Sequence, residues 1–219
     1  MKFFLITFAY FFIISTQVYA ADDVATPSTY KVTMKKVELC TSSACTTTTL
    51  LAEKDGTFNI ASASAGADVG DWITSFALEV GTTYTHIKAT LSTTMTIAGY
   101  TTNSDISSDY CVTESSPNTA SAANQGAIVD GSSSTTNAEM SYIVPNQANA
   151  DNGDPYGDID FSGNGITRSN NSATMYWIGA LSSSYTPTAN SAPKITIKFD
   201  VTDQLKSTQQ AADACYMWV

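Results

Sequence analysis

Apolar and polar residues alternate along much of this chain, with the period of two that is typical of β-strands. In residues 29–39 the apolar positions shift by one after Met34 and resume at Val37, which predicts a β-bulge within a long strand. Residues 194–201 alternate without a break. Shorter strands are predicted at 50–51, 58–60, 94–100, 110–112, 140–144 and 173–181, the last apolar enough to be central in a sheet.

The clearest hairpin in the pattern joins residues 73–80 to residues 83–91 through a Gly-Thr turn. The second of these strands presents aliphatic side chains on one face. We expect Tyr84, His86 and Lys88 on its opposite face.

Three stretches depart from the alternation. Residues 115–138 and 146–165 are rich in small and polar side chains, so we expect long loops there. Residues 202–214 begin with capping residues and continue with helix formers, which predicts one short C-terminal helix. The whole pattern predicts an all-β fold, a single β-sandwich of Ig-like or jelly-roll-like type over residues 30–219, with long loops and that helix.

Residues 1–20 have the composition of a signal peptide. Lys2 precedes an apolar run, and a small-x-small triplet ends at Ala20, so we expect cleavage after that residue. The run is short for a membrane span, and no transmembrane segment is expected after cleavage. Residues 21–29 are expected to lead flexibly into the domain. The sequence therefore predicts an exported protein that is extracellular, at the cell surface or periplasmic.

Few side chains are charged. Asp, Glu, Lys and Arg make up 14% of the 219 residues, and the net charge is −10, against a typical charged share of roughly 25%. The acidity excludes the basic surface that a nucleic-acid partner requires. The richness in Thr, Ala, Ser, Gly and Asn resembles that of fimbrial subunits and other extracellular bacterial fibre proteins. This resemblance implies envelope or extracellular proteins, or glycans, as partners, and assembly as a homo-oligomer.

Four cysteines allow three disulfide pairings, and an even number in an exported chain favours disulfides. We favour Cys40–Cys45, because a tight loop can join them, and Cys111–Cys215, which then ties a mid-chain strand to the end of the chain. A metal or redox site is the alternative, but the Cys-x4-Cys spacing and a single histidine give it little support.

The acidic segment 151–165 holds the best candidate for a metal site. Asp158, Asp160 and Ser162 alternate before a glycine, as at the start of a calcium-binding loop, and Asp154 adds a nearby oxygen ligand. The glutamate that usually completes such a loop is missing, and Asp and Gly are also common turn residues. A plain loop therefore stays the alternative, and calcium, if bound, would order the loop. No other cofactor is indicated.

Aromatic and titratable side chains offer further candidates. Trp72 follows a Gly-Asp pair, and we expect it to be exposed and able to stack on a sugar ring, whereas Trp177 is expected in the core. His86 is the sole histidine, and its role as a general base is weighed against that of a half-exposed strand residue. No nucleophile motif or carboxylate pair is identifiable, so we expect no enzyme.

These features predict a secreted or cell-surface, non-enzymatic β-sandwich. We expect it to act as a structural, adhesive or binding module of a bacterial envelope, with a filament subunit as one form. A carbohydrate-binding module ordered by calcium is the alternative, and a secreted hydrolase is the third hypothesis. The apolar ending of the chain suits a final core strand or a longer parent protein.

Overall fold

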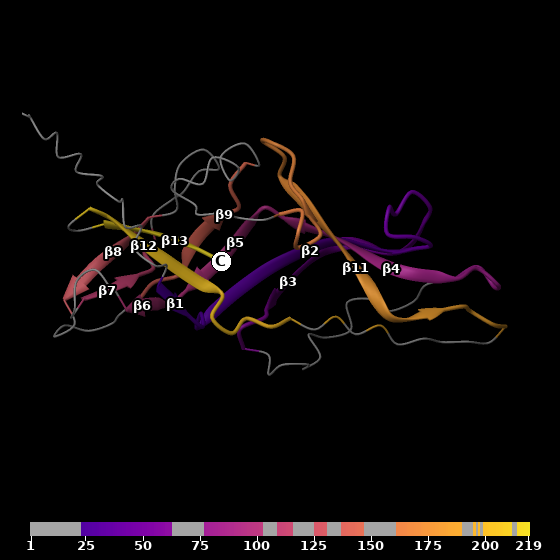
Figure 1. The fold of residues 1–219 in the computed structure, drawn as a ribbon, viewed down its shortest axis with the longest axis horizontal. Coiled ribbons are helices and arrows are strands. Elements are labelled where there is room, and N and C mark those ends of the chain that lie inside the picture. The colour runs from indigo at the N-terminus through magenta and orange to yellow at the C-terminus, as the bar shows by residue number, and fades with distance from the viewer. Residues whose placement is uncertain are drawn as a thin grey trace, which may run out of the picture.

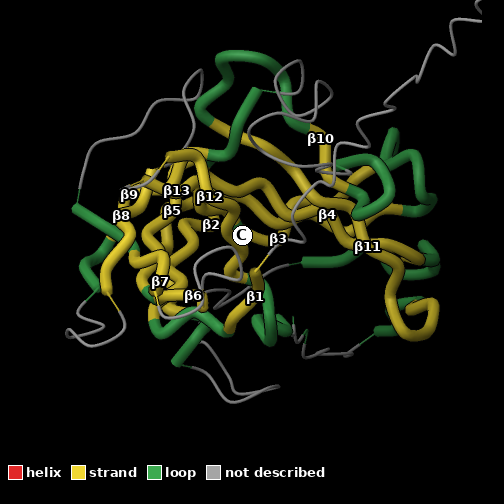
Figure 2. Tube along the Cα trace, turned by 60° about the vertical axis from the view of Figure 1, so that its left-hand side comes forward, coloured by secondary structure: helices red, strands yellow, loops and turns green. Residues whose placement is uncertain are grey.

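The structure is a computed structural model. It describes residues 23–62, 77–102, 109–115, 125–130, 137–146, 161–189, 195, 197, 199–211 and 214–219. In this part of the chain the fold is all-β, with thirteen strands in two curled sheets and no helix (Figures 1 and 2). The arrangement fits a sandwich-like or barrel-like architecture, and it contains no helix long and apolar enough to cross a membrane.

The seven-stranded sheet is built around one long strand, β2 (Thr29–Cys40). One edge of β2 pairs with β3 (Thr48–Asn59), and the other edge pairs first with β4 (Tyr84–Ser92) and then with β5 (Thr94–Ala98). Outside these lie β11 (Thr174–Tyr185) with β10 (Ile166–Thr167), and β9 (Met140–Ile143) beside β5. All of these pairings are antiparallel.

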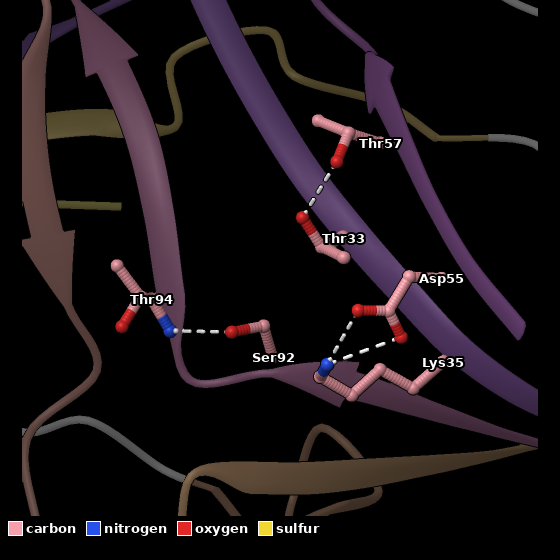
Figure 3. Close-up of polar contacts among 6 residues, drawn as sticks. All are labelled: Thr33, Lys35, Asp55, Thr57, Ser92 and Thr94. Atoms are coloured by element: carbon pink, nitrogen blue, oxygen red, sulfur yellow. Dashed lines mark hydrogen bonds and ion pairs between the residues drawn. The ribbon is translucent and has the colours of Figure 1, made fainter.

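Polar side chains tie β2 to β3 on the exposed side of the sheet (Figure 3). The hydroxyl groups of Thr33 and Thr57 lie 2.8 Å apart, and the Lys35 Nζ donates to both carboxylate oxygens of Asp55 at 3.2 and 3.0 Å.

Strand β2 has a β-bulge opposite β4. Met34 pairs with Leu91 and Lys36 pairs with Thr90, so β2 advances by two residues where β4 advances by one. The bulge predicted at this point of the sequence is therefore confirmed.

The six-stranded sheet has the order β1-β12-β13-β8-β7-β6. It curls until its two edge strands, β1 (Asp23–Ala25) and β6 (Tyr100–Thr102), contact one another, as Figure 1 shows. A buried hydrogen bond of 2.6 Å between the Thr101 and Ser207 hydroxyl groups joins β6 to β12. The other strands are β7 (Asp109–Val112), β8 (Gln125–Asp130), β12 (Leu205–Ala211) and β13 (Ala214–Trp218).

The chain passes from one sheet to the other at Gly99, between β5 and β6. A Cβ at this position would lie 2.7 Å from the Leu205 Cδ2, so only glycine fits without a shift of that side chain. The buried Thr113 hydroxyl accepts the Gly99 N–H at 3.1 Å and donates to the Ala138 carbonyl at 2.7 Å. The crossing is therefore both tightly packed and hydrogen-bonded.

Two apolar clusters form the core. The larger one lies between the sheets and includes Ile97, Tyr142 and Met217, each at most 1% exposed. The smaller one lies on the half of the seven-stranded sheet that carries Val37 and Leu39. Segments outside the strands cover this second cluster, with Leu78, Ile195, Ile197 and Phe199 packed against it.

Both predicted disulfides are confirmed. Cys40–Cys45 closes the turn between β2 and β3, with Cα atoms 4.9 Å apart. Cys111–Cys215 joins β7 to β13 inside the larger cluster, with Cα atoms 6.2 Å apart. The described residues contain no free cysteine.

The predicted C-terminal helix is wrong, because Leu205–Ala211 form strand β12. Leu205 and Ser207 are buried while Lys206 and Thr208 are half-buried, which is the period of a strand rather than that of a helix. β12 pairs on one side with β13 and on the other with β1. The pairing with β12 also corrects a second expectation. The sequence led us to expect a flexible segment over residues 21–29, but Asp23–Ala25 of this segment form strand β1 of the sheet.

The predicted hairpin between residues 73–80 and 83–91 is not formed by the residues described. Residues 77–80 lie outside any strand, and the two edges of β4 are occupied by β2 and β11. A strand has only two hydrogen-bonding edges, so no place remains for a third partner. The described residues of 194–201 are likewise outside strands, although their apolar side chains are half-buried.

Two further strands differ from the sequence pattern. The short strands expected around residues 55–56 are one continuous strand, β3. The segment 173–181 belongs to β11, which lies next to the edge strand β10 and is mostly half-buried, so it is not central.

Candidate functional site

A cavity of about 450 Å³ lies between the two sheets and is partly open to solvent. Its floor consists of apolar and aromatic side chains that are each at most 5% exposed: Met95, Tyr142, Phe161, Met175 and Trp218. The seven-stranded sheet supplies most of the wall, and β12 and β13 supply the opposite side. The volume lies within the range of about 300–1,000 Å³ that is typical of small-molecule sites.

Two glycines shape the wall of the cavity. Gly179 leaves room for the Trp177 indole, because a Cβ there would lie 2.1 Å from the indole Cζ2. Gly165 has a φ of 70°, in the left-handed region that favours glycine. Its turn is closed by the Ile166 N–H, which donates to the Phe161 carbonyl at 2.8 Å and so holds Phe161 against the cavity.

Few polar groups line the cavity. Tyr30 is half-buried, and burial raises the pKa of its phenol to about 12, so the hydroxyl stays protonated and neutral at physiological pH. Lys206 is half-buried on β12 and makes no ion pair within the residues described. Asp200 is exposed at the mouth, where the Thr202 N–H donates to its carboxylate at 3.0 Å and lowers its pKa. The lining of the cavity is therefore mainly apolar and aromatic, with few charged groups.

A second polar feature lies in the loops beside β10. The Arg168 side chain is 3% exposed and donates to the Ser169 carbonyl and, at 3.2 Å, to the Asn146 Oδ1. The same Asn146 oxygen accepts the Asn171 N–H at 2.8 Å. Burial lowers the pKa of the Arg168 guanidinium, but a guanidinium remains charged at neutral pH. This network fixes the loops around residue 168, and the sequence pattern gave no sign of it.

The candidate calcium ligands are mostly outside the described residues. Asp154, Asp158 and Asp160 are not among the residues that the structure describes, whereas Ser162 is described and is exposed in the turn before β10. Trp72, the candidate for stacking on a sugar, also lies outside the described residues. Among the residues described, no group of three or more His, Cys, Asp or Glu side chains is placed to hold a metal ion. The calcium hypothesis therefore stays a prediction.

His86 lies on β4, half-buried, with its Nδ1 2.8 Å from the Thr85 hydroxyl. Tyr84 does not share an exposed face with it, contrary to our expectation. Tyr84 is fully buried in the smaller cluster, and its hydroxyl lies 2.8 Å from that of Thr49. The β11 ladder slips beside Tyr84, which breaks the simple alternation of faces there.

The cavity was not predicted as a site, although several of its residues were noted as aromatic. Tyr30, Tyr142 and Trp218 are more than 70 positions apart in the sequence. They meet because β2, β9 and β13 belong to facing sheets. Sequence spacing contains no signal for such a juxtaposition.

Comparison of the chain with protein-family models, with curated proteins and with solved structures finds no match. The function is therefore argued from the site itself.

Proposed function

We propose that the chain is an exported, non-enzymatic β-sandwich that acts as a structural, adhesive or binding module of a bacterial envelope. Among these roles, the observation that carries our choice is the aromatic-lined cavity between the sheets, which favours binding. Two disulfides support folding in an oxidising compartment outside the cytosol.

The polar groups of the cavity favour binding over catalysis. Tyr30, Asp200 and Lys206 are spread around the wall and the mouth. Among the described residues that line it, no histidine or cysteine is present. Histidine is the base that most often activates a serine or cysteine nucleophile, so its absence from this lining favours binding.

Binding is tested with the neutral fluorescent probe N-phenyl-1-naphthylamine and the whole mature protein. We expect a saturable rise in probe fluorescence, and quenching or a spectral shift of Trp177 and Trp218, which line the cavity. Ile166→Trp adds bulk at the half-buried wall and should abolish probe binding. Val80→Trp, at a position that is 63% exposed and outside the cavity, should not.

Thermal unfolding of both variants checks that they are folded. If the probe does not saturate, or if Ile166→Trp binds it as well as the unmodified protein does, the cavity is not the binding site. Filaments of the purified protein in electron micrographs would favour the structural form of the proposal instead.

A carbohydrate-binding module is the second candidate, and one surface feature favours it. Tyr100 on β6 is 42% exposed, and its ring meets that of Tyr110 edge to face at 5.4 Å between centroids. Exposed aromatic rings provide the flat apolar surface on which a sugar ring stacks. Calorimetric titration with oligosaccharides should give saturable heat that Tyr100→Ala removes and Val24→Ala retains, and heat unaffected by Tyr100→Ala would exclude this site.

A further inference from the structure

We infer that the cavity binds an amphipathic carboxylate, with its apolar chain between the sheets and its carboxylate beside Lys206. This inference rests on the proposed binding function and adds the chemical class of the ligand. Three observations carry it: the character of the floor, the position of Lys206 and the volume.

The floor favours an apolar body. Met95, Tyr142, Phe161, Met175 and Trp218 are almost completely buried around it. A charged group placed against these side chains would lose its water, and the Tyr142 hydroxyl and the Trp218 indole N–H are the donors that these five side chains offer in return. The polar end of a ligand therefore has to lie at the mouth.

Lys206 is the cationic side chain among the described residues that line the cavity. It is paired directly with Trp218 across β12 and β13, so the two side chains share the face that lines the cavity. Within the described residues no carboxylate lies in ion-pair contact with Lys206.

The other polar groups at the mouth are occupied within their own loop. The Asp200 carboxylate accepts the Thr202 N–H at 3.0 Å, and the Gln204 Nε2 donates to the Thr202 carbonyl at 3.1 Å. Tyr30 stays neutral, because burial raises its pKa to about 12. Among the described lining residues an anionic head group therefore finds one complementary charge, Lys206, and one like charge, the exposed Asp200. The half-buried position of Lys206 strengthens its attraction relative to open water, whereas solvent screens the exposed Asp200.

The volume limits the length of the chain. A cavity of about 450 Å³ holds about fifteen non-hydrogen atoms if each takes the roughly 30 Å³ that a molecule occupies in liquid water. Dodecanoate, with about fourteen such atoms, matches this size and serves as the probe.

The experiment compares dodecanoate with dodecan-1-ol as competitors of N-phenyl-1-naphthylamine at pH 8, below the concentrations at which either aggregates. With the unmodified protein we expect dodecanoate to bind about tenfold more tightly than the alcohol, a ratio typical of one charge-assisted contact. Lys206→Met should bring this ratio to about one and leave the affinity for the alcohol within about twofold. Lys35→Met, which removes a lysine that pairs with Asp55 away from the cavity, should leave the ratio unchanged.

The outcomes separate the two levels of the argument. Equal affinities for the acid and the alcohol, or a preference that persists in Lys206→Met, overturn the carboxylate inference while the binding function stands. If the naphthylamine probe itself does not bind, both the proposed function and this inference fail. A preference lost equally in Lys35→Met would show that the net charge of the protein, and not Lys206, selects the acid.

Discussion

Replacing Cys111 and Cys215 together by alanine removes the cross-link between β7 and β13. The two cysteines are 104 positions apart, whereas Cys40 and Cys45 are five apart. In the chain-entropy treatment, a disulfide stabilises the fold because it lowers the conformational entropy of the unfolded chain. At 25 °C this effect is about 4.7 kcal/mol for the long loop and about 2 kcal/mol for the short loop. We therefore expect the long-range pair to cost more than twice as much stability as the local pair.

Urea unfolding under oxidising conditions measures both losses. A loss of about 4.7 kcal/mol corresponds to a fall in Tm of about 10–20 °C for a domain of this size, and the loss at the local pair to about 4–8 °C. Alanine also removes two sulfur atoms from the core, because Cys111 and Cys215 are each 1% exposed. The matched control is the Cys40→Ala, Cys45→Ala protein before and after reduction, which breaks the long-range cross-link and keeps both sulfur atoms.

Two results would refute this reasoning. Equal losses for the two pairs would mean that loop length does not set the stabilisation. A large loss in the alanine variant combined with a small loss on reduction would assign the effect to packing around the sulfur atoms.

Three further predictions follow from named contacts. Tyr30→Phe should reduce the loss of stability between about pH 10 and 12. Folding raises the pKa of the Tyr30 phenol to about 12, so its contribution of about 1–3 kcal/mol is complete below pH 10 and is lost as the pH rises through 12. Denaturation curves of both proteins at pH 8 and 11.5 measure this difference. Gly99→Ala should cost about 1–3 kcal/mol in chemical unfolding, because its Cβ would meet Leu205 at 2.7 Å, and an unchanged midpoint would contradict this packing. Asn146→Ala should cost about 1–3 kcal/mol in the same assay, because it leaves a buried Arg168 donor without its acceptor, and a loss near zero would show that water replaces the amide.

The alternation of apolar and polar residues was sufficient to predict strands where one face of the sheet is buried and the other is more exposed. Tyr30, Val32 and Met34 belong to β2 as expected, and the shift before Val37 is a true bulge. Burial also alternates from Leu205 to Thr208, but most of these residues are polar, so the sequence shows no apolar alternation there. Such residues favour neither helix nor strand strongly, and the helix prediction failed. In β12 it is pairing with β1 and β13 that decides the structure, and a local pattern does not contain the partners.

The hairpin prediction failed for the same reason. A turn sequence beside Val80 indicated a local return of the chain, but β2 and β11 occupy both edges of β4. The disulfides could be predicted because loop length and parity restrict the pairings. The cavity could not be predicted, because Lys206 and Tyr30 come to line it through the stacking of two sheets and not through any spacing along the chain.

The order in which the chain is synthesised has a consequence for the six-stranded sheet. β1, near the start of the described residues, pairs with β12, and Cys111 pairs with Cys215, so this sheet waits for residues that are synthesised much later than β1. Cys40 and Cys45 are both synthesised much earlier, and their separation of five positions makes their loop easy to close in the unfolded chain. We therefore expect the Cys40–Cys45 bond to form first, which removes the two wrong partners that Cys111 would otherwise meet. Trapping free thiols at successive times during oxidative refolding would show this order, and early pairing of Cys111 with Cys40 or Cys45 would contradict it. The local disulfide then acts as a safeguard on the fidelity of the distant one.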